Sequence, residues 1–271
     1  MLTKTKRLII TGIVAYLLII AGQVEYAIYD NLPVSATNNY AFNYLFDTVQ
    51  PYGSDETMIG SIAIFLLLPI IGSALAIYIK NNHELYSVIG RTGWKSFFKK
   101  CMGYTFWGAT GLYWLGCLLE ILMINTFYHP FIYIAFSNDI LQGGYGYFSL
   151  NSLANLLIKI ILNGIGWGIY ALFILSVALF INKVSRALSL GPVIGFVIIL
   201  QERFAPDVGR VLTNISNIWD ITNITNPLEK GIAGLPTPAI YYLNYVTTAV
   251  FYIALAAVLL RLWYVKNVER G

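Results

Sequence analysis

The sequence predicts an all-α, polytopic membrane protein with six transmembrane helices. Of its 271 residues, 58% are hydrophobic and 11% are charged, whereas soluble domains are roughly 45–50% apolar and about 25% charged. Several apolar runs reach the roughly 20 residues that a helix needs to cross the bilayer core. Lys and Arg gather in the segments on one side of these runs, as they do in cytoplasmic loops. We therefore expect residues 1–271 to form a single transmembrane domain.

The six candidate spans differ in length. Five are long enough to cross a bilayer, at residues 8–29, 58–79, 103–125, 152–181 and 241–265. The sixth, at residues 191–200, is shorter, and it crosses only if its helix begins a turn earlier or lies against protein. Lys4, Lys6 and Arg7 precede the first run, but no small-residue cleavage site follows it. We therefore expect a retained span rather than a signal peptide.

The distribution of Lys and Arg orients the chain. With a cytoplasmic N-terminus and six crossings, thirteen of the seventeen fall on the cytoplasmic side, as the positive-inside rule requires. They are Lys4, Lys6, Arg7, Lys80, Arg91, Lys95, Lys99, Lys100, Lys183, Arg186, Arg261, Lys266 and Arg270. We expect a multi-pass protein of the cell membrane with both termini in the cytoplasm.

Residues 80–102 are the longest positively charged break between apolar runs. Their apolar residues repeat at the i, i+3, i+4 spacing of a helix. They are Leu85, Val88 and Ile89 before a break at residues 90–93, and Trp94, Phe97, Phe98 and Cys101 after it. The pattern predicts two short amphipathic helices at a membrane surface, which could dock a soluble partner. An ordinary positively charged loop is the alternative.

Two of the predicted outer segments have distinct compositions. Residues 30–57 contain no Lys or Arg and are expected to pack over the outer face. Residues 204–239, between the fifth and sixth spans, alternate Ile with Asn, Thr and Ser, and their last half contains Pro227, Pro236 and Pro238. We expect them to form a re-entrant outer segment, since irregular backbone is tolerated at membrane depth only against protein or water.

Charged residues also fall within the predicted spans. Glu120 lies five residues from the outer end of the third span, and Lys159 about eight residues into the fourth, so both sit about 8–12 Å deep. Charges inside a membrane cost several kcal/mol unless they are paired or hydrated. We expect either a Glu120–Lys159 ion pair or a water-filled outer cavity shared with Glu25, Glu202 and Arg203. These residues would be structural or would line a transport path.

The sequence indicates neither an enzyme nor a metal site. His83 and His129 fall on opposite sides of the predicted membrane. Cys101 and Cys117 are sixteen residues apart on one predicted helix, too far apart to form a disulfide. The sequence also lacks a P-loop and the common hydrolase motifs. We expect no catalytic residues, no bound cofactor and no nucleic-acid partner.

The pattern as a whole resembles the permease subunits of bacterial type-2 ATP-binding-cassette (ABC) exporters, of the type found in peptide or bacteriocin export and immunity. At residue level the resemblance rests on Glu84, Leu85, Ile89, Gly90, Arg91, Trp94, Lys95, Phe97, Phe98 and Lys100. It implies that the central cytoplasmic stretch is a coupling helix that seats in a groove of a separate ABC ATPase. The expected coupling residues are Glu84, Leu85, Ile89, Arg91, Trp94, Lys95 and Phe98.

The resemblance further implies that ATP and Mg bind to the partner ATPase. Two permease subunits, identical or different, would pair to form the path for an amphiphilic peptide or drug-like substrate. Only seven residues precede the first span, so the N-terminal interface helix common in this family is not expected. The alternative is a stand-alone polytopic immunity or scaffold protein that binds a toxin or partner without transport.

Overall fold

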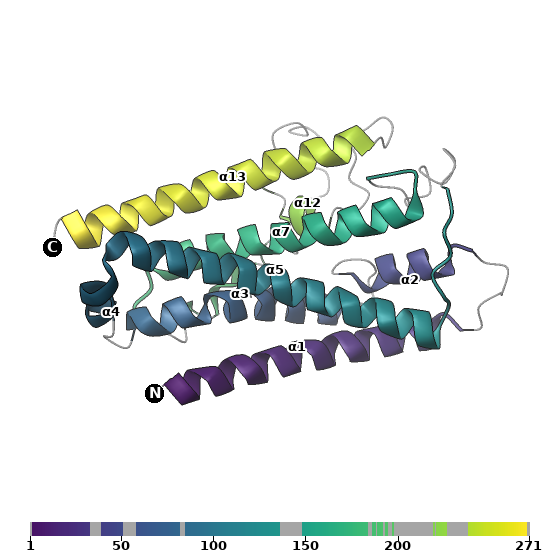
Figure 1. The fold of residues 1–271 in the computed structure, drawn as a ribbon, viewed down its shortest axis with the longest axis horizontal. Helices are drawn as coiled ribbons and strands as arrows, with labels where there is room; N and C mark the ends of the chain where they lie inside the picture. Colours follow the sequence, from purple (N-terminus) through teal and green to yellow (C-terminus); the bar gives the residue numbers. More distant parts are fainter. Residues whose placement is uncertain are drawn as a thin grey trace.

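The computed structural model is almost entirely helical over the residues that it describes (Figure 1). These are residues 2–32, 39–50, 58–81, 85–135, 148–183, 186–187, 189–191, 193–194, 197, 219, 221–226 and 238–269. The main helices are α1 (Leu2–Asp30), α2 (Ala41–Val49), α3 (Met58–Asn81), α4 (Leu85–Thr92), α5 (Trp94–Phe127), α7 (Ser152–Ala178), α12 (Thr222–Thr225) and α13 (Pro238–Tyr264), with a π-helical turn at Val265–Glu269. The predicted all-α class is confirmed, since no β-strand occurs among these residues.

In the described part of the chain, four helical stretches are long and apolar enough to cross a membrane. Three lie within α1, α5 and α7, and the fourth, Tyr242–Asn267, runs through α13 into the π-helical turn. Helix α3 adds a shorter apolar stretch, Ala63–Ala74. These five helices contain most of the five longer runs that the sequence predicts. Most of the sixth candidate, residues 191–200, lies outside the described residues, so six crossings remain a prediction.

The long helices run lengthwise through the bundle (Figure 1). Helices α1 and α13 lie on opposite sides, with α3, α5 and α7 between them, and both chain termini lie at the same end as α4. Helix α7 is central, because it contacts α3, α5, α12 and α13 and is buried along most of its length.

The boundary between α4 and α5 differs from the prediction of two separate surface helices. Gly90 is helical, and the break falls at Gly93 alone. Gly93 has a φ of 74°, a left-handed conformation that glycine adopts without steric cost. Beyond it, α5 continues without interruption for 34 residues. Because neither proline nor positive φ interrupts Trp94–Phe127, the second amphipathic stretch is the beginning of a long apolar helix.

Helix α2 corrects the expectation that residues 30–57 pack over the outer face. Its apolar side chains Phe42, Leu45, Phe46 and Val49 are each at most 1% exposed. The helix contacts α1 and α5, and the Phe42 ring meets the Phe131 ring edge-on at 5.2 Å. The i, i+3, i+4, i+7 spacing of these four residues gives α2 one apolar face, which buries it inside the end of the bundle.

Helix α12 lies deep in the bundle. Residues 221–226 are buried and contact α7 and α13. A Cβ placed on Gly166, midway along α7, would lie 1.7 Å from the carbonyl oxygen of Ile224, so glycine permits this close approach. Asn223 Nδ2 donates to Thr248 Oγ1 at 3.2 Å. Most of the predicted re-entrant segment lies outside the described residues, so its full course remains a prediction.

Candidate functional site

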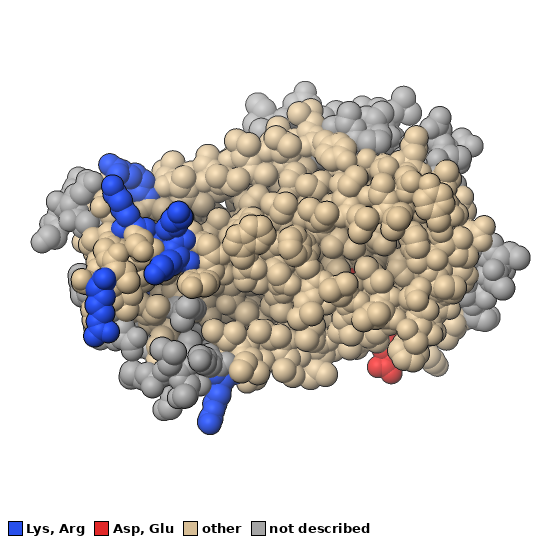
Figure 2. Space-filling model, viewed as in Figure 1, with Lys and Arg blue, Asp and Glu red and all other residues tan. Residues whose placement is uncertain are grey.

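One end of the bundle is strongly basic. Figure 2 shows Lys and Arg gathered at the end where Figure 1 places α4 and the chain termini. We call this the basic end and define it by eight exposed residues: Arg91, Lys95, Lys99, Lys100, Lys183, Arg186, Arg261 and Lys266. Two of the predicted coupling residues, Arg91 and Lys95, therefore belong to a charged surface, and surface charge of this kind steers association with an oppositely charged partner.

The predicted coupling residues occupy two kinds of position. Arg91 and Lys95 are exposed, whereas Ile89 is 7% exposed and joins an apolar cluster beneath α4. Leu85 begins α4, and Glu84 lies outside the described residues.

Trp94 and Phe98 do not stand free at the surface, because they pack against α13. The Trp94 and Phe98 rings lie 6.1 and 5.6 Å from the Trp263 ring, and both also contact the Tyr264 ring. Aromatic contacts of this kind contribute about 0.5–1.5 kcal/mol each beyond the area that they bury. We name Trp94, Phe98, Trp263 and Tyr264 the aromatic corner, which fastens the start of α5 to the end of α13.

The apolar cluster beneath α4 connects the basic end to the rest of the bundle. Its buried residues come from α3, α4, α5, the end of α7 and α13. They are Ala76, Ile77, Ile89, Phe97, Leu175, Ala178, Leu179, Ala187 and Trp263. Because close-packed interiors transmit strain, a displacement of α4 would reach α3, α5, α7 and α13.

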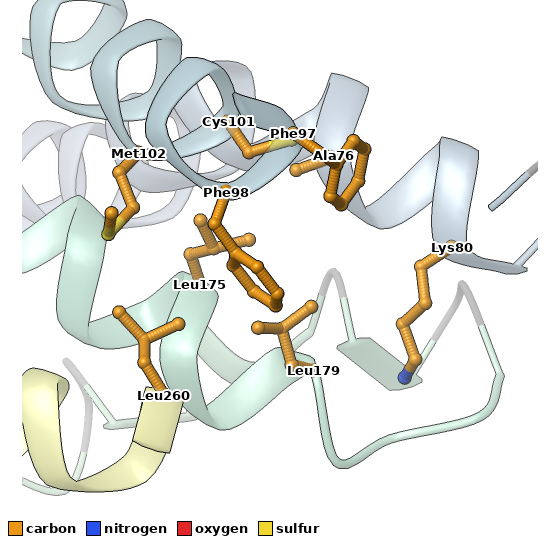
Figure 3. Close-up of a pocket in the computed structure, with 9 residues that line it drawn as sticks. All are labelled: Ala76, Lys80, Phe97, Phe98, Cys101, Met102, Leu175, Leu179 and Leu260. Atoms are coloured by element: carbon orange, nitrogen blue, oxygen red, sulfur yellow. The ribbon is translucent and has the colours of Figure 1, made fainter. Parts of the chain in front are cut away.

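Lys80 ends this region at the junction of α3 and α7 (Figure 3). Its Nζ donates to the carbonyl oxygen of Ile181 at 2.7 Å and of Ala178 at 3.5 Å, close to where α7 ends. The Ala178 oxygen also accepts from the Ile181 N–H at 3.1 Å. Partial burial lowers the pKa of Lys80 to about 8. The neighbouring pocket encloses about 300 Å³ when open solvent is included, and its enclosed part has room for about one water molecule.

A second candidate site lies in the opposite half of the bundle. Lys159 Nζ pairs with Asp47 Oδ1, and the two side chains are 1% and 16% exposed. Gln50 Nε2 donates to Glu120 Oε2 at 2.6 Å, and Glu120 is 3% exposed. Each of Lys159 and Glu120 lies seven residues from the nearer end of its helix, or about 10 Å along the axis.

Further hydrogen bonds extend the Gln50–Glu120 pair, which also interacts electrostatically with Lys159. Tyr113 OH donates to Gln50 Oε1 at 2.7 Å, and Asn163 Nδ2 donates to Tyr113 OH at 3.4 Å. We name Asp47, Gln50, Tyr113, Glu120, Lys159 and Asn163 the polar cluster. Because α2, α5 and α7 each contribute to it, the cluster joins distant parts of the chain.

The sequence correctly selected Glu120 and Lys159 as buried charges but missed their direct partners. The two attract each other electrostatically, while the ion pair shown for Lys159 is with Asp47. Asp47 and Gln50 were missed because residues 30–57 read as an outer loop. The apolar spacing of α2 from Phe42 to Val49 is the signal that could have placed them.

The other residues predicted to line the path are Glu25, Glu202 and Arg203. Glu25 is exposed on α1, and Glu202 and Arg203 lie outside the described residues. Within the described part of the chain, no group of three or more His, Cys, Asp or Glu side chains could hold a metal ion.

Comparison with known proteins adds no family to this geometry. No protein-family model matches the sequence, and no curated protein or solved structure is similar to it.

Proposed function

We propose that the chain is the membrane-spanning subunit of an ABC exporter, coupled to a separate ATPase. The observation that carries this proposal is the placement of α4. It is a short helix at the basic end, between two long helices, with Ile89 buried and Arg91 exposed, and Lys95 is exposed just beyond it at the start of α5. A helix in this position can take a force from a soluble partner and pass it to the bundle.

The proposed coupling separates two roles among the expected residues. Arg91 and Lys95 would contact the ATPase, together with Glu84. Ile89 would transmit the resulting displacement into the apolar cluster beneath α4, and Trp94 and Phe98 would carry it to α13 through the aromatic corner. ATP and Mg would bind to the partner, whose closure would shift the bundle between two packed arrangements.

We propose that the transport path forms between two permease subunits. The pocket at Lys80 is too small for an amphiphilic peptide, since its 300 Å³ includes open solvent. Large apolar side chains are exposed along α1, α5 and α13, and in a membrane these faces would meet lipid or a second subunit. The substrate class, an amphiphilic peptide or drug-like molecule, follows from the family resemblance alone.

The test is isolation of the chain from its native membrane, followed by assay of ATP hydrolysis in vesicles. We expect a P-loop ATPase to co-purify. The double variant Arg91→Glu/Lys95→Glu should weaken that association at least about tenfold, equivalent to about 1.4 kcal/mol. Lys266→Glu is the matched control, because it reverses an exposed charge at the same end outside the coupling residues.

Two results would overturn the proposal. One is retention of the ATPase and of coupled hydrolysis by the double variant. The other is a chain that carries no ATPase and binds a toxin or partner protein without nucleotide, which would favour the stand-alone immunity or scaffold protein.

A further inference from the structure

The polar cluster contains more acidic groups than basic groups. Two carboxyl groups, Asp47 and Glu120, lie with one ammonium group, Lys159. If both acids were ionised, the cluster would hold one negative charge in excess inside the bundle. An uncompensated buried charge costs several kcal/mol even after the surroundings relax. Binding of one proton removes that cost.

The geometry selects Glu120 as the carboxyl that holds the proton. Asp47 has the direct ion pair with Lys159, and its side chain is partly exposed at 16%. Glu120 is 3% exposed, and the hydrogen bond shown for it comes from the neutral amide of Gln50. Water and Lys159 therefore stabilise an ionised Asp47 better than an ionised Glu120.

The titratable neighbours of Glu120 do not supply a second positive charge. Helix α1 contributes Tyr16, α5 contributes Tyr113 and Cys117, and α7 contributes Lys159. The phenols and the thiol are neutral in their protonated forms and become negative when they ionise. Lys159 is thus the cation among the described groups that interact electrostatically with Glu120.

An independent observation is that buried polar atoms beside the polar cluster lack a hydrogen-bond partner. Three polar atoms are buried without a hydrogen-bond partner along the seam between α5 and α7: Asn163 Oδ1, Trp167 Nε1 and Thr110 Oγ1. Asn163 and Trp167 are one helical turn apart on α7, as Thr110 and Tyr113 are on α5. The Tyr113 and Trp167 rings stack at 6.3 Å across this seam, so Trp167 lies beside the polar cluster. Buried polar groups in this state are commonly satisfied by ordered water.

We propose that Glu120 is a proton-binding site inside the bundle, in contact with ordered water in the seam between α5 and α7. Water in the seam can carry the proton to and from the carboxyl group. Asp47 marks the place where the polar cluster approaches the surface. The site lies at the other end of the bundle from α4 (Figure 1), so this inference does not depend on the proposed ATPase coupling.

Infrared spectroscopy of the purified protein in lipid nanodiscs tests the proposal. Exposed Asp and Glu side chains are ionised at pH 7, so a carbonyl band of a protonated carboxylic acid there reports a perturbed group. We expect such a band in the wild type at pH 7, its loss at alkaline pH and its loss in Glu120→Gln. Glu25→Gln is the control and should retain the band, because the Glu25 carboxyl group is exposed on α1 and does not belong to the polar cluster.

A second variant provides an independent test if Glu120→Gln does not fold. Gln50→Leu removes the amide that donates to Glu120 and should move the band to higher frequency. Absence of the band from folded wild type overturns the proposal. So does a band that survives in Glu120→Gln or does not move in Gln50→Leu, since that band would belong to another carboxyl group.

Discussion

At the scale of single residues, Gly166 shows how the centre of the bundle is specified. A Cβ at this position would lie 1.7 Å from the Ile224 carbonyl oxygen. That atom belongs to backbone and cannot rotate away. Any side chain at position 166 must therefore push α12 off α7.

Gly166→Ala is expected to lower the free energy of unfolding by about 1–3 kcal/mol, the usual range for overpacking a buried site. Thermal or denaturant unfolding in mild detergent measures this change. Gly111→Ala is the control, because nothing lies within 4 Å of a Cβ there, and alanine improves helix propensity by up to about 1 kcal/mol. Equal effects of the two substitutions would contradict the close contact with α12.

The lowered pKa of Lys80 predicts that the stability of the protein depends on pH. Its pKa is lowered from 10.5 to about 8 by partial burial, so between these values the unfolded chain holds a proton that the folded chain has released. The free energy of unfolding contributed by Lys80 therefore rises with pH across that window. Unfolding of the wild type should gain stability relative to Lys80→Met between pH 8 and 10. A flat or falling difference would show that the pKa of Lys80 is not lowered.

Residue chemistry also explains how much of the polar cluster was predictable. The cost of charge in a membrane made Glu120 and Lys159 identifiable from the sequence. Their partners Asp47 and Gln50 lie in a segment with few long apolar runs, and the pairing across 112 and 70 positions depends on tertiary structure. No local sequence pattern specifies a pairing between residues so far apart along the chain.

At the scale of elements, periodicity predicted helices well and their boundaries less well. The apolar stripe from Leu85 to Ile89 became α4, but the stripe from Trp94 became part of α5. Both stripes have the same spacing, and the difference is the backbone conformation of Gly93. The sequence offered two glycines as the break, and local propensity alone does not distinguish between them.

The aromatic corner is the element-scale feature with the clearest energetic consequence. Trp263 is 4% exposed and contacts both Trp94 and Phe98. Trp263→Ala should lower the free energy of unfolding by about 3–5 kcal/mol, as expected for a buried aromatic residue. Limited proteolysis should also reveal release of the end of α13.

The adjacent Leu262 provides the comparison for that experiment. It is 56% exposed, and Leu262→Ala should change the free energy of unfolding by no more than about 0.5 kcal/mol in detergent. Comparable losses in the two variants would mean that the corner does not fasten α13 to α5.

At the scale of the whole molecule, composition and charge predicted the class of fold. The longer apolar runs became long helices, and most of the described Lys and Arg side chains gathered at the end that holds both termini. The number of crossings is less predictable, because the run at residues 191–200 is shorter than a bilayer requires. The start of this run packs against the bundle, since Gly191 is buried and its carbonyl oxygen accepts from Tyr170 OH at 3.2 Å.

The proposed function requires that a nucleotide-hydrolysing partner binds the basic end at Arg91 and Lys95. Site-specific photocross-linking in intact cells tests it most directly, with the cross-linker at Lys95 and, as control, at Trp107, which is 60% exposed farther along α5. The account predicts a covalent adduct with a P-loop ATPase from position 95 and none from position 107. Absence of an ATPase adduct from position 95 would contradict the proposal. So would labelling of position 95 by a membrane-impermeant reagent added outside the cell.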